Sequence, residues 1–179
     1  MFSTVNIIGY LGLLFIIASF QFDDRKKILG LHIISALFYF VHLLMIGALT
    51  GAFMAFFTAV RNFVFIQKTK SQWAKSSSWP FGFIAIFIFG TYLTWAGPIS
   101  LLPLCGMISG TIARWSTKEK TLRLLALIPS PFWLIYNYSV GSLPAILGES
   151  SVFTSNLIGI TRFDILKKRK QKEATPGPF

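Results

Sequence analysis

Seven long apolar runs, separated by short polar segments, occupy almost all of this chain of 179 residues. The hydrocarbon core of a bilayer is about 30 Å thick, so an α-helix needs roughly 20 apolar residues to cross it. The runs lack the alternation of polar and apolar residues that membrane-spanning β-strands show, which excludes a transmembrane barrel. We therefore expect an all-α membrane protein with seven transmembrane helices, at about 5–21, 28–48, 50–67, 79–96, 99–115, 121–139 and 144–163.

The distribution of basic residues predicts how these spans are oriented. The chain has 17 Lys and Arg against 6 Asp and Glu, a net charge of +11. Nearly all the basic residues follow spans one, three and five or lie in the tail, whereas the connections at 48–51, 96–98 and 139–143 hold none. Basic loops remain in the cytoplasm, so we expect the N-terminus outside and the C-terminus in the cytoplasm. The charge reflects orientation, and no nucleic acid partner is expected.

The sequence lacks the signatures of enzymes and of bound cofactors. It has no H-E-x-x-H, no G-x-S-x-G and no phosphate-binding loop, and it contains 2 His and 1 Cys. We therefore expect no enzymatic activity, no catalytic residue, no cofactor and no metal site. Cys105 lies inside an apolar run, where a small packing residue is the simplest interpretation. Residues 5–21 have no basic segment before them and no A-x-A pattern after them, so we expect a span rather than a cleaved signal peptide.

A weak internal repeat relates the first three spans to the last three. Apolar composition alone would produce several matches, but here a basic residue, two turn glycines and a membrane-embedded amide agree together. When the chain is shifted by 94 residues, eight identities fall into register: Gly12 with Gly106, Lys26 with Lys120, Leu31 with Leu125, Phe38 with Phe132, Gly47 with Gly141, Leu49 with Leu143, Asn62 with Asn156 and Ile66 with Ile160.

The number of spans decides how the two repeats are related. Two three-span units joined directly would be inverted, and one extra span between them restores the same orientation. We therefore expect two parallel three-helix repeats joined by a linker helix, with repeat one at about 5–67, the linker at about 79–96 and repeat two at about 99–163. Together they form a single transmembrane domain, residues 1–165, followed by a basic cytoplasmic tail, residues 166–179.

This 3+1+3 arrangement, with an asparagine in the third helix of each unit, resembles the SWEET and PQ-loop superfamily of small transporters. The stretch Gly9-Tyr10-Leu11-Gly12, the segment Ala18-Ser19-Phe20-Gln21 and the following Asp24-Arg25-Lys26 resemble more specifically the YgjV-type family of bacterial inner-membrane proteins, which is related to that superfamily. The resemblance extends over residues 5 to about 165 and implies a bacterial inner-membrane location. In sugar-transporting members the paired asparagines line a central pocket, which implies that role for Asn62 and Asn156.

The chain departs from the superfamily at two places. The Pro-Gln signature after the first helix is replaced by Phe20-Gln21, and Arg114-Trp115 stands near that position in the second unit. Helix-kinking prolines occur at Pro129 and Pro131 in the sixth span, whereas the corresponding places in the second span are taken by Ser35 and Leu37. The resemblance therefore does not extend to the hinges of the first unit.

Asn62 and Asn156 are the main candidates for a solute-binding site. Each lies within an apolar span, where an amide without a hydrogen-bonding partner costs several kcal/mol. If the units are related by an axis along the membrane normal, both amides face their interface, where transporters of this kind bind substrate. The alternative is that each amide bonds a neighbouring helix and contributes about 1 kcal/mol to helix association.

Two charged residues lie near these asparagines. Glu149 precedes Asn156 by seven residues and so lies on nearly the same helical face, roughly 10 Å closer to the outer side. It is a candidate gate or proton-linked carboxylate, or else a solvated residue at the outer mouth, which is the interpretation we favour. Arg61 is about 100° from Asn62 around its helix, so we expect it to extend toward the cytoplasmic interface or to pair with a backbone carbonyl.

His42 and Tyr136 form a third candidate pair, since they occupy equivalent positions of the two repeats. With Trp133 and Asn137 nearby, they offer stacking and hydrogen bonds to a polar ligand. The favoured alternative is that Tyr136, Trp133 and Tyr138 belong to an aromatic belt at the membrane surface and that His42 is a packing residue.

These observations favour a carrier for a small polar solute, with sugar as an extrapolation from the superfamily. The mechanism would be rocking of one unit against the other about a midplane pocket, and uniport is favoured because no coupling-ion site is visible. The competing hypothesis is a non-transporting membrane sensor, or an assembly or scaffold protein on the same fold. The expected partners are the lipid bilayer and the solute, and a homo-oligomer remains open.

Overall fold

The computed structural model describes residues 3–22, 24–68, 70–116, 124–125 and 127–161, which form helices and turns without any strand. Two 3-10 turns, η1 (Gln72–Lys75) and η2 (Pro98–Ser100), lie on either side of α4. The prediction of an all-helical chain with seven helices is confirmed for these residues, whereas the predicted tail, 166–179, lies outside them. The seven α-helices are α1 (Thr4–Ser19), α2 (Arg25–Met45), α3 (Leu49–Gln67), α4 (Ser78–Leu93), α5 (Leu101–Trp115), α7 (Pro129–Ser139) and α8 (Leu143–Gly159).

Three helices begin at a side chain that caps their first backbone amides. Ser3 and Asp24 each accept a hydrogen bond from the amide two residues later, at 3.2 Å and 2.8 Å. Ser142 accepts one from the amide of Ala145 at 3.4 Å. Such caps satisfy backbone donors that the start of a helix leaves unpaired. The polar residues between the apolar runs therefore set where α1, α2 and α8 begin.

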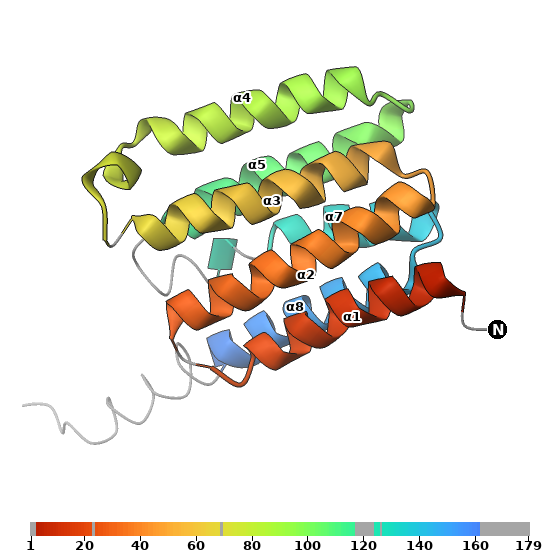
Figure 1. Cartoon of the computed structure of the whole chain (residues 1–179), viewed down its shortest axis with the longest axis horizontal. Coiled ribbons are helices and arrows are strands. Elements are labelled where there is room, and N and C mark those ends of the chain that lie inside the picture. Colours follow the sequence, from red (N-terminus) through yellow and green to blue (C-terminus); the bar gives the residue numbers. More distant parts are fainter. Residues whose placement is uncertain (1–2, 23, 69, 117–123, 126, 162–179) are drawn as a thin grey trace, which may run out of the picture.

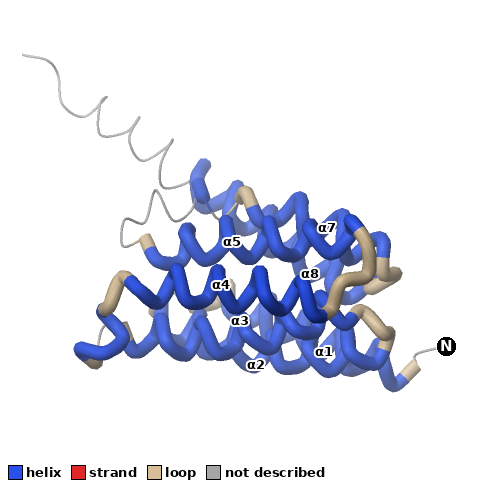
Figure 2. The backbone as a smooth tube through the Cα atoms, turned by 90° about the horizontal axis from the view of Figure 1, so that it is seen from above, coloured by secondary structure: helices blue, strands red, loops and turns tan. Residues whose placement is uncertain are grey.

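Six helices form a closed ring, and one helix lies outside it (Figure 1). α1, α2 and α3 lie side by side in chain order, and so do α5, α7 and α8. The two sets meet where α3 packs against α5 and where α1 packs against α8, which closes the ring. α4 lies outside the ring, against α5 and α3. Figure 2 shows that the helices run along a common direction, as a bilayer-spanning bundle requires.

The two ends of the bundle differ in charge. The turns after α2, α4 and α7 lie at the end where α1 begins, which we call the N-terminal end, and α8 ends at the opposite end (Figure 1). The connections at the N-terminal end, 46–48, 94–100 and 140–142, contain no Lys or Arg. The opposite end is called the basic end, because the described helix termini and connections there hold Arg25, Lys26, Lys27, Lys68, Lys70, Lys75 and Arg114.

Large apolar side chains cover the outside of the bundle. Among them are Phe81 and Tyr92 on α4, which are 74% and 77% exposed, and Tyr138 on α7, which is 79% exposed. Two helices, Arg25–Met45 and Leu49–Gln67, are long and apolar enough to cross a membrane, and α1 and α4 are shorter apolar helices. Exposed apolar surface on this scale indicates contact with lipid or with another apolar surface, which fits a helical membrane protein.

The turns that follow α2 and α7 have the same geometry. Gly47 has a φ of 76° and Gly141, 94 residues later, has a φ of 71°, both in the left-handed region that favours glycine. The residue after each glycine donates its amide to the carbonyl five residues earlier, Ala48 to Leu43 and Ser142 to Asn137, each at 2.9 Å. Each helix therefore ends in a Schellman turn at the same place in the two sets.

A second matched feature lies between the first two helices of each set. A Cβ atom added to Gly12 would lie 3.3 Å from the Ser35 carbonyl oxygen. A Cβ atom added to Gly106 would lie 3.5 Å from the Pro129 carbonyl oxygen. Ser35 and Pro129 are themselves 94 residues apart. The glycine allows α1 to approach α2, and α5 to approach α7, at equivalent points.

The sixth span differs from the second. α2 is continuous over 21 residues, and Ser35 within it donates a hydrogen bond to the Gly12 carbonyl at 2.7 Å. α7 begins only at Pro129 and has 11 residues, and residues 127 and 128 before it are not helical. Proline lacks an amide donor and clashes with the preceding turn of a helix. The span predicted over 121–139 is therefore interrupted at Pro129; residues 121–123 and 126 lie outside the described ranges.

Candidate functional site

Asn62 is buried on the face of α3 that is directed into the ring. Gly51 and Thr58 share this face by their helical spacing; the Gly51 amide bonds the Tyr136 hydroxyl, and the Thr58 hydroxyl lies 3.4 Å from Sδ of Met107. The Asn62 side chain is 0% exposed, and neither its Oδ1 nor its Nδ2 has a hydrogen-bonding partner within the described chain. An unpaired buried polar group costs about 1–3 kcal/mol. The Asn62 amide therefore has one acceptor atom and two donor hydrogens without a partner in the described chain.

Asn156 lies on α8, which does not adjoin α3 in the ring. α8 packs against α1 and α7, whereas α3 packs against α2, α4 and α5. Asn156 is partly buried and lies toward the basic end of α8, as Asn62 lies toward the basic end of α3. The two amides therefore belong to different sides of the ring, and no hydrogen bond joins them among the described residues.

Arg61 is buried within the bundle. Its side chain is 1% exposed, its Nη1 donates a 2.9 Å hydrogen bond to Oγ1 of Thr111 on α5, and its guanidinium carbon lies 6.0 Å from the Phe87 ring centre on α4. Nε of Arg61 has no partner among the described residues. The expectation that Arg61 extends to the cytoplasmic interface is wrong, because a hydroxyl acceptor and an aromatic face hold it in the seam between α3, α4 and α5.

Arg114 lies near titratable groups of three other helices, and the sequence did not single it out as functional. Its guanidinium folds back over Gly110, where an added Cβ would lie 3.0 Å from Nη1, and its hydrogen bond to the Gly110 carbonyl is long, 3.4 Å. It lies close enough to His32 on α2, Arg61 on α3 and Glu149 on α8 to interact with each electrostatically. The signal in the sequence is the glycine one turn before Arg114, which leaves room for the guanidinium.

Glu149 lies inside the bundle beside the break in the sixth span. Its Oε1 accepts a 2.5 Å hydrogen bond from the buried hydroxyl of Ser130, in the first turn of α7. The positive end of a helix dipole favours a carboxylate at such a place. Glu149 is partly buried and lies six residues into α8, about 9 Å along its axis. A solvated carboxylate at the outer mouth does not fit this position, because its partner is a buried hydroxyl.

His42 and Tyr136 join the two sets of helices near the N-terminal end. Nε2 of His42 lies 2.8 Å from Oγ of Ser142, and its Nδ1 lies 2.8 Å from the Val5 carbonyl oxygen. The hydroxyl of Tyr136 accepts a 2.8 Å hydrogen bond from the Gly51 amide. Both side chains are buried, so Tyr136 does not belong to a surface aromatic belt. A ligand could contact these polar atoms only if their present hydrogen bonds opened.

One face of α2 is polar along its length, a feature that the sequence analysis missed. His32 lies 2.9 Å from Oγ of Ser19 on α1, and Tyr39 donates a 3.2 Å hydrogen bond to the Pro144 carbonyl on α8. Through these contacts α2 is held to its neighbour α1 and, across the ring, to α8. The signal is a spacing of three or four residues, which places side chains on one side of a helix: His32, Ser35, Tyr39 and His42.

Two cations hold the C-terminus of α5 at the basic end. Arg25 donates a 3.1 Å hydrogen bond to the Arg114 carbonyl, and Nζ of Lys68 donates a 3.0 Å hydrogen bond to the Trp115 carbonyl. Nζ of Lys68 also lies 3.4 Å from the centre of the Trp115 ring. Burial, and then the charge of Arg25, lower the pKa of Lys68. Cations bind the free carbonyls and the negative dipole at a helix C-terminus, so these contacts close the two sets together.

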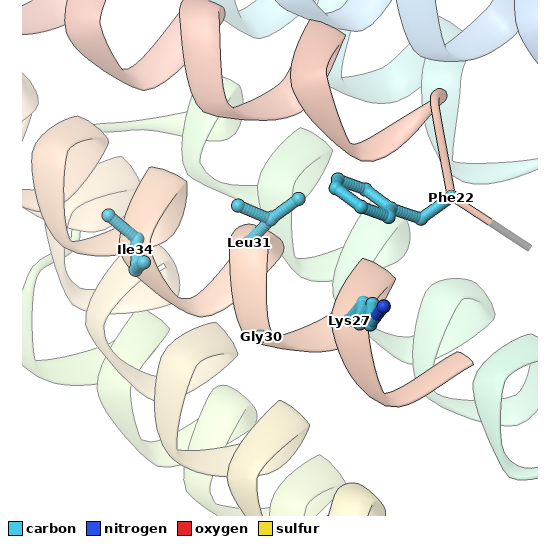
Figure 3. A pocket seen from close by; sticks show the side chains of 5 residues that line it. All are labelled: Phe22, Lys27, Gly30, Leu31 and Ile34. Carbon is cyan, nitrogen blue, oxygen red and sulfur yellow. The ribbon is translucent and has the colours of Figure 1, made fainter. Parts of the chain in front are cut away.

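An apolar groove lies elsewhere, on α2 near the basic end (Figure 3). It is open, has a volume of about 330 Å³ and is lined by Phe22, Lys27, Gly30, Leu31 and Ile34. It contains none of the residues that the sequence singled out, so it is separate from the polar site inside the ring.

Comparison with known proteins assigns the chain to a family. The profile of the family Imp-YgjV, described as bacterial inner membrane protein, matches residues 3–167. The chain is 28% identical over 169 residues to inner membrane protein YgjV of Escherichia coli (strain K12), which covers 92% of this chain and 85% of that relative. No solved structure matches. Because the family profile extends over nearly the whole chain, the chain belongs to this family of bacterial inner membrane proteins.

Proposed function

We propose that the protein is a carrier for a small polar solute, which binds inside the six-helix ring. The observation that carries this proposal is Asn62, a fully buried amide whose donor and acceptor atoms lack partners among the described residues. A polar side chain in a membrane interior is costly and usually marks a functional site. The solute would bond Asn62 from one set of helices and Asn156 from the other.

The two sets of helices are, on this proposal, parallel repeats joined by α4, as in the SWEET and PQ-loop transporters. The Schellman turns at Gly47 and Gly141 and the close approaches at Gly12 and Gly106 support the repeat. The pattern of contacts also supports it, because a two-fold axis along the membrane normal would exchange the α3–α5 contact with the α8–α1 contact. That axis would pass through the ring and exchange Asn62 with Asn156.

The orientation follows from charge. Basic residues gather at one end of the bundle and are missing from the connections at the other end, in the described part of the chain. Because basic segments stay in the cytoplasm, the basic end faces the cytoplasm. The protein then crosses the inner membrane several times, with its N-terminus in the periplasm and its C-terminus in the cytoplasm.

During transport the bundle would open at one end and then at the other. His42 and Tyr136 hold the sets together near the N-terminal end, and Arg25 and Lys68 hold them at the basic end. Rocking of one set against the other would break one group of contacts while the other persists. Opening of the N-terminal end would release His42, Tyr136 and Glu149 to an incoming solute. No coupled ion is required, so the solute would move down its own gradient.

Uptake by proteoliposomes tests the proposal. Purified wild type is reconstituted and challenged with a panel of radiolabelled sugars, polyols, amino acids and organic acids. Asn62→Ala and Asn156→Ala are expected to reduce uptake of the transported solute at least about 10-fold, since each removes hydrogen bonds to it. The matched control is Ser109→Ala, because the Ser109 hydroxyl bonds carbonyls of its own helix.

Either of two results would contradict the proposal, the first its transport function and the second its binding site. One is that no solute in the panel enters wild-type vesicles, which would favour a membrane sensor or assembly protein on this fold. The other is uptake that both asparagine variants retain in full, which would separate transport from these side chains.

A further inference from the structure

The described charges in and beside the ring do not cancel: Arg61 lies in the seam between α3, α4 and α5, and Arg114 and Glu149 lie close to one another. Arg61 and Arg114 repel each other electrostatically, and Glu149 is the carboxylate that interacts with Arg114. No carboxylate of the described chain bonds either guanidinium, and Arg61 lies near a like charge, that of Arg114. A buried charge without a partner is strongly unfavourable. The interior therefore favours the entry of a negative charge.

The donors needed to bind that charge are already in place. A guanidinium has five N–H donors, and within the described part of the chain Arg114 uses one of them, in a long bond to its own helix. Its side chain is partly exposed, so the remaining donors can be reached. Nε of Arg61 and the whole amide of Asn62 are buried and unpaired among the described residues. Because Arg61 bonds Thr111, one turn before Arg114, these groups lie at one level of the bundle.

On the basis of the proposed transport function, we infer that the solute carries a carboxylate group, which Arg114 and Asn62 bind inside the ring. A guanidinium matches a carboxylate with two parallel hydrogen bonds, stronger than bonds between neutral groups. Asn62 adds a donor to the carboxylate or an acceptor to a neighbouring hydroxyl or ammonium group of the solute.

The site would bind such a solute in one orientation. At the positions 94 residues away, Arg114 corresponds to Phe20, and Glu149 corresponds to Ala55. The pair Arg114 and Glu149 therefore occurs in the set α5, α7 and α8 and has no charged counterpart in the other set, although the helices repeat. A carboxylate would lie toward Arg114, and a donor at the other end of the solute would lie toward Glu149.

Binding and uptake are measured on the full-length protein with four small solutes that differ in charge. These are lactate, an anion; alanine, a zwitterion; succinate, a dicarboxylate; and glucose, a neutral solute. We expect lactate or alanine to bind in detergent and to enter proteoliposomes. Arg114→Gln is expected to weaken binding about 10- to 100-fold, the usual effect of losing a charged hydrogen-bond pair. Arg114→Lys should recover part of the loss, since it keeps the charge but not the paired geometry.

Two further variants keep the test decisive. Asn62→Asp places a carboxylate of the protein beside the guanidinium groups, so it should abolish binding of lactate and alanine while the protein stays folded. Lys26→Gln removes the same amount of positive charge at an exposed position and should leave binding unchanged. If Arg114→Gln fails to fold, Asn62→Asp alone decides.

Each outcome bears on one of the two proposals. Carboxylate binding that Arg114→Gln and Asn62→Asp remove supports the inference, and the contrast of alanine with lactate shows whether Glu149 takes an ammonium group. Uptake of glucose alone overturns the inference and leaves a carrier for another solute. Carboxylate uptake that neither variant changes overturns the assignment of Arg114 and Asn62 as the binding residues and leaves a carrier that binds its solute elsewhere. If none of a broad panel binds or moves, the carrier itself is refuted and the inference falls with it.

Discussion

Arg61 donates a 2.9 Å hydrogen bond to Oγ1 of Thr111, and both side chains are buried between α3, α4 and α5. The Thr111 hydroxyl in turn donates to the Met107 carbonyl in its own helix, at 2.7 Å. An arginine whose described partners are one hydroxyl and one aromatic ring is an unusual component of an apolar core. The hydroxyl is therefore expected to matter more for stability than its size suggests.

Thr111→Val should destabilise the protein by about 1–3 kcal/mol, because it removes the acceptor of a buried cation while conserving shape. Thr111→Ser keeps the hydroxyl and should therefore destabilise the protein much less. Thermal unfolding in detergent, followed by circular dichroism, compares the two. Equal melting temperatures for Thr111→Val and wild type would show that Arg61 does not depend on this bond.

Gly47→Ala and Gly141→Ala should each cost about 1–2 kcal/mol, because L-residues are strained at positive φ. Open space surrounds both glycines, so steric contact adds nothing to the strain. Gly30→Ala is the matched control: Gly30 also has open space around it but lies within α2, where Ala is the better helix former. In the same unfolding assay we expect Gly47→Ala and Gly141→Ala to lose similar amounts of stability and Gly30→Ala to lose none. A large difference between the two turn variants would contradict their equivalence.

Cysteine labelling checks the proposed orientation. Cys105 is exposed and is first replaced by Ala. In that background, Ala96→Cys should react with a membrane-impermeant maleimide in spheroplasts, because the N-terminal end of the bundle faces the periplasm. Gln72→Cys, exposed near the basic end, should react only after the membrane is opened. The reverse pattern would place the basic end in the periplasm and overturn the assignment.

A double-mutant cycle on Lys68 and Trp115 measures the closure at the basic end. Lys68→Ala and Trp115→Leu should be coupled by about 0.5–1 kcal/mol, the usual strength of a cation–aromatic contact near a surface. The control is the same cycle with Lys70→Ala in place of Lys68→Ala, because Lys70 is an exposed lysine nearby. The absence of coupling would show that the cation and ring act independently. If the contact closes this end, both single variants should also change the rate of solute exchange.

Much of the helix content follows from the sequence by one physical constraint. A backbone in lipid must satisfy its own hydrogen bonds, so each long apolar run has to be a helix. For that reason the first five spans and the seventh were located to within a few residues, while the sixth was not. Pro129 lacks the amide that would continue a helix through it, and its break was underestimated because the surrounding run is as apolar as the others.

Only part of the candidate site could be predicted from the sequence. Asn62 stood out because an amide is rare in an apolar run, and the structure leaves it buried and unpaired among the described residues. Arg114 was interpreted as an ordinary basic residue at a helix end. Its place in the cluster depends on Gly110, which leaves room for its side chain, and on titratable groups from three other helices.

The sequence by itself determined the class of the protein, because hydropathy and backbone hydrogen bonding are local properties of each run. Only the tertiary structure decided that Arg61 is buried against Thr111 and that His42 is hydrogen-bonded to Ser142. These partners are 50 and 100 residues apart in the chain. Which charges meet inside the ring depends on how six helices close around it, and no local pattern encodes that closure.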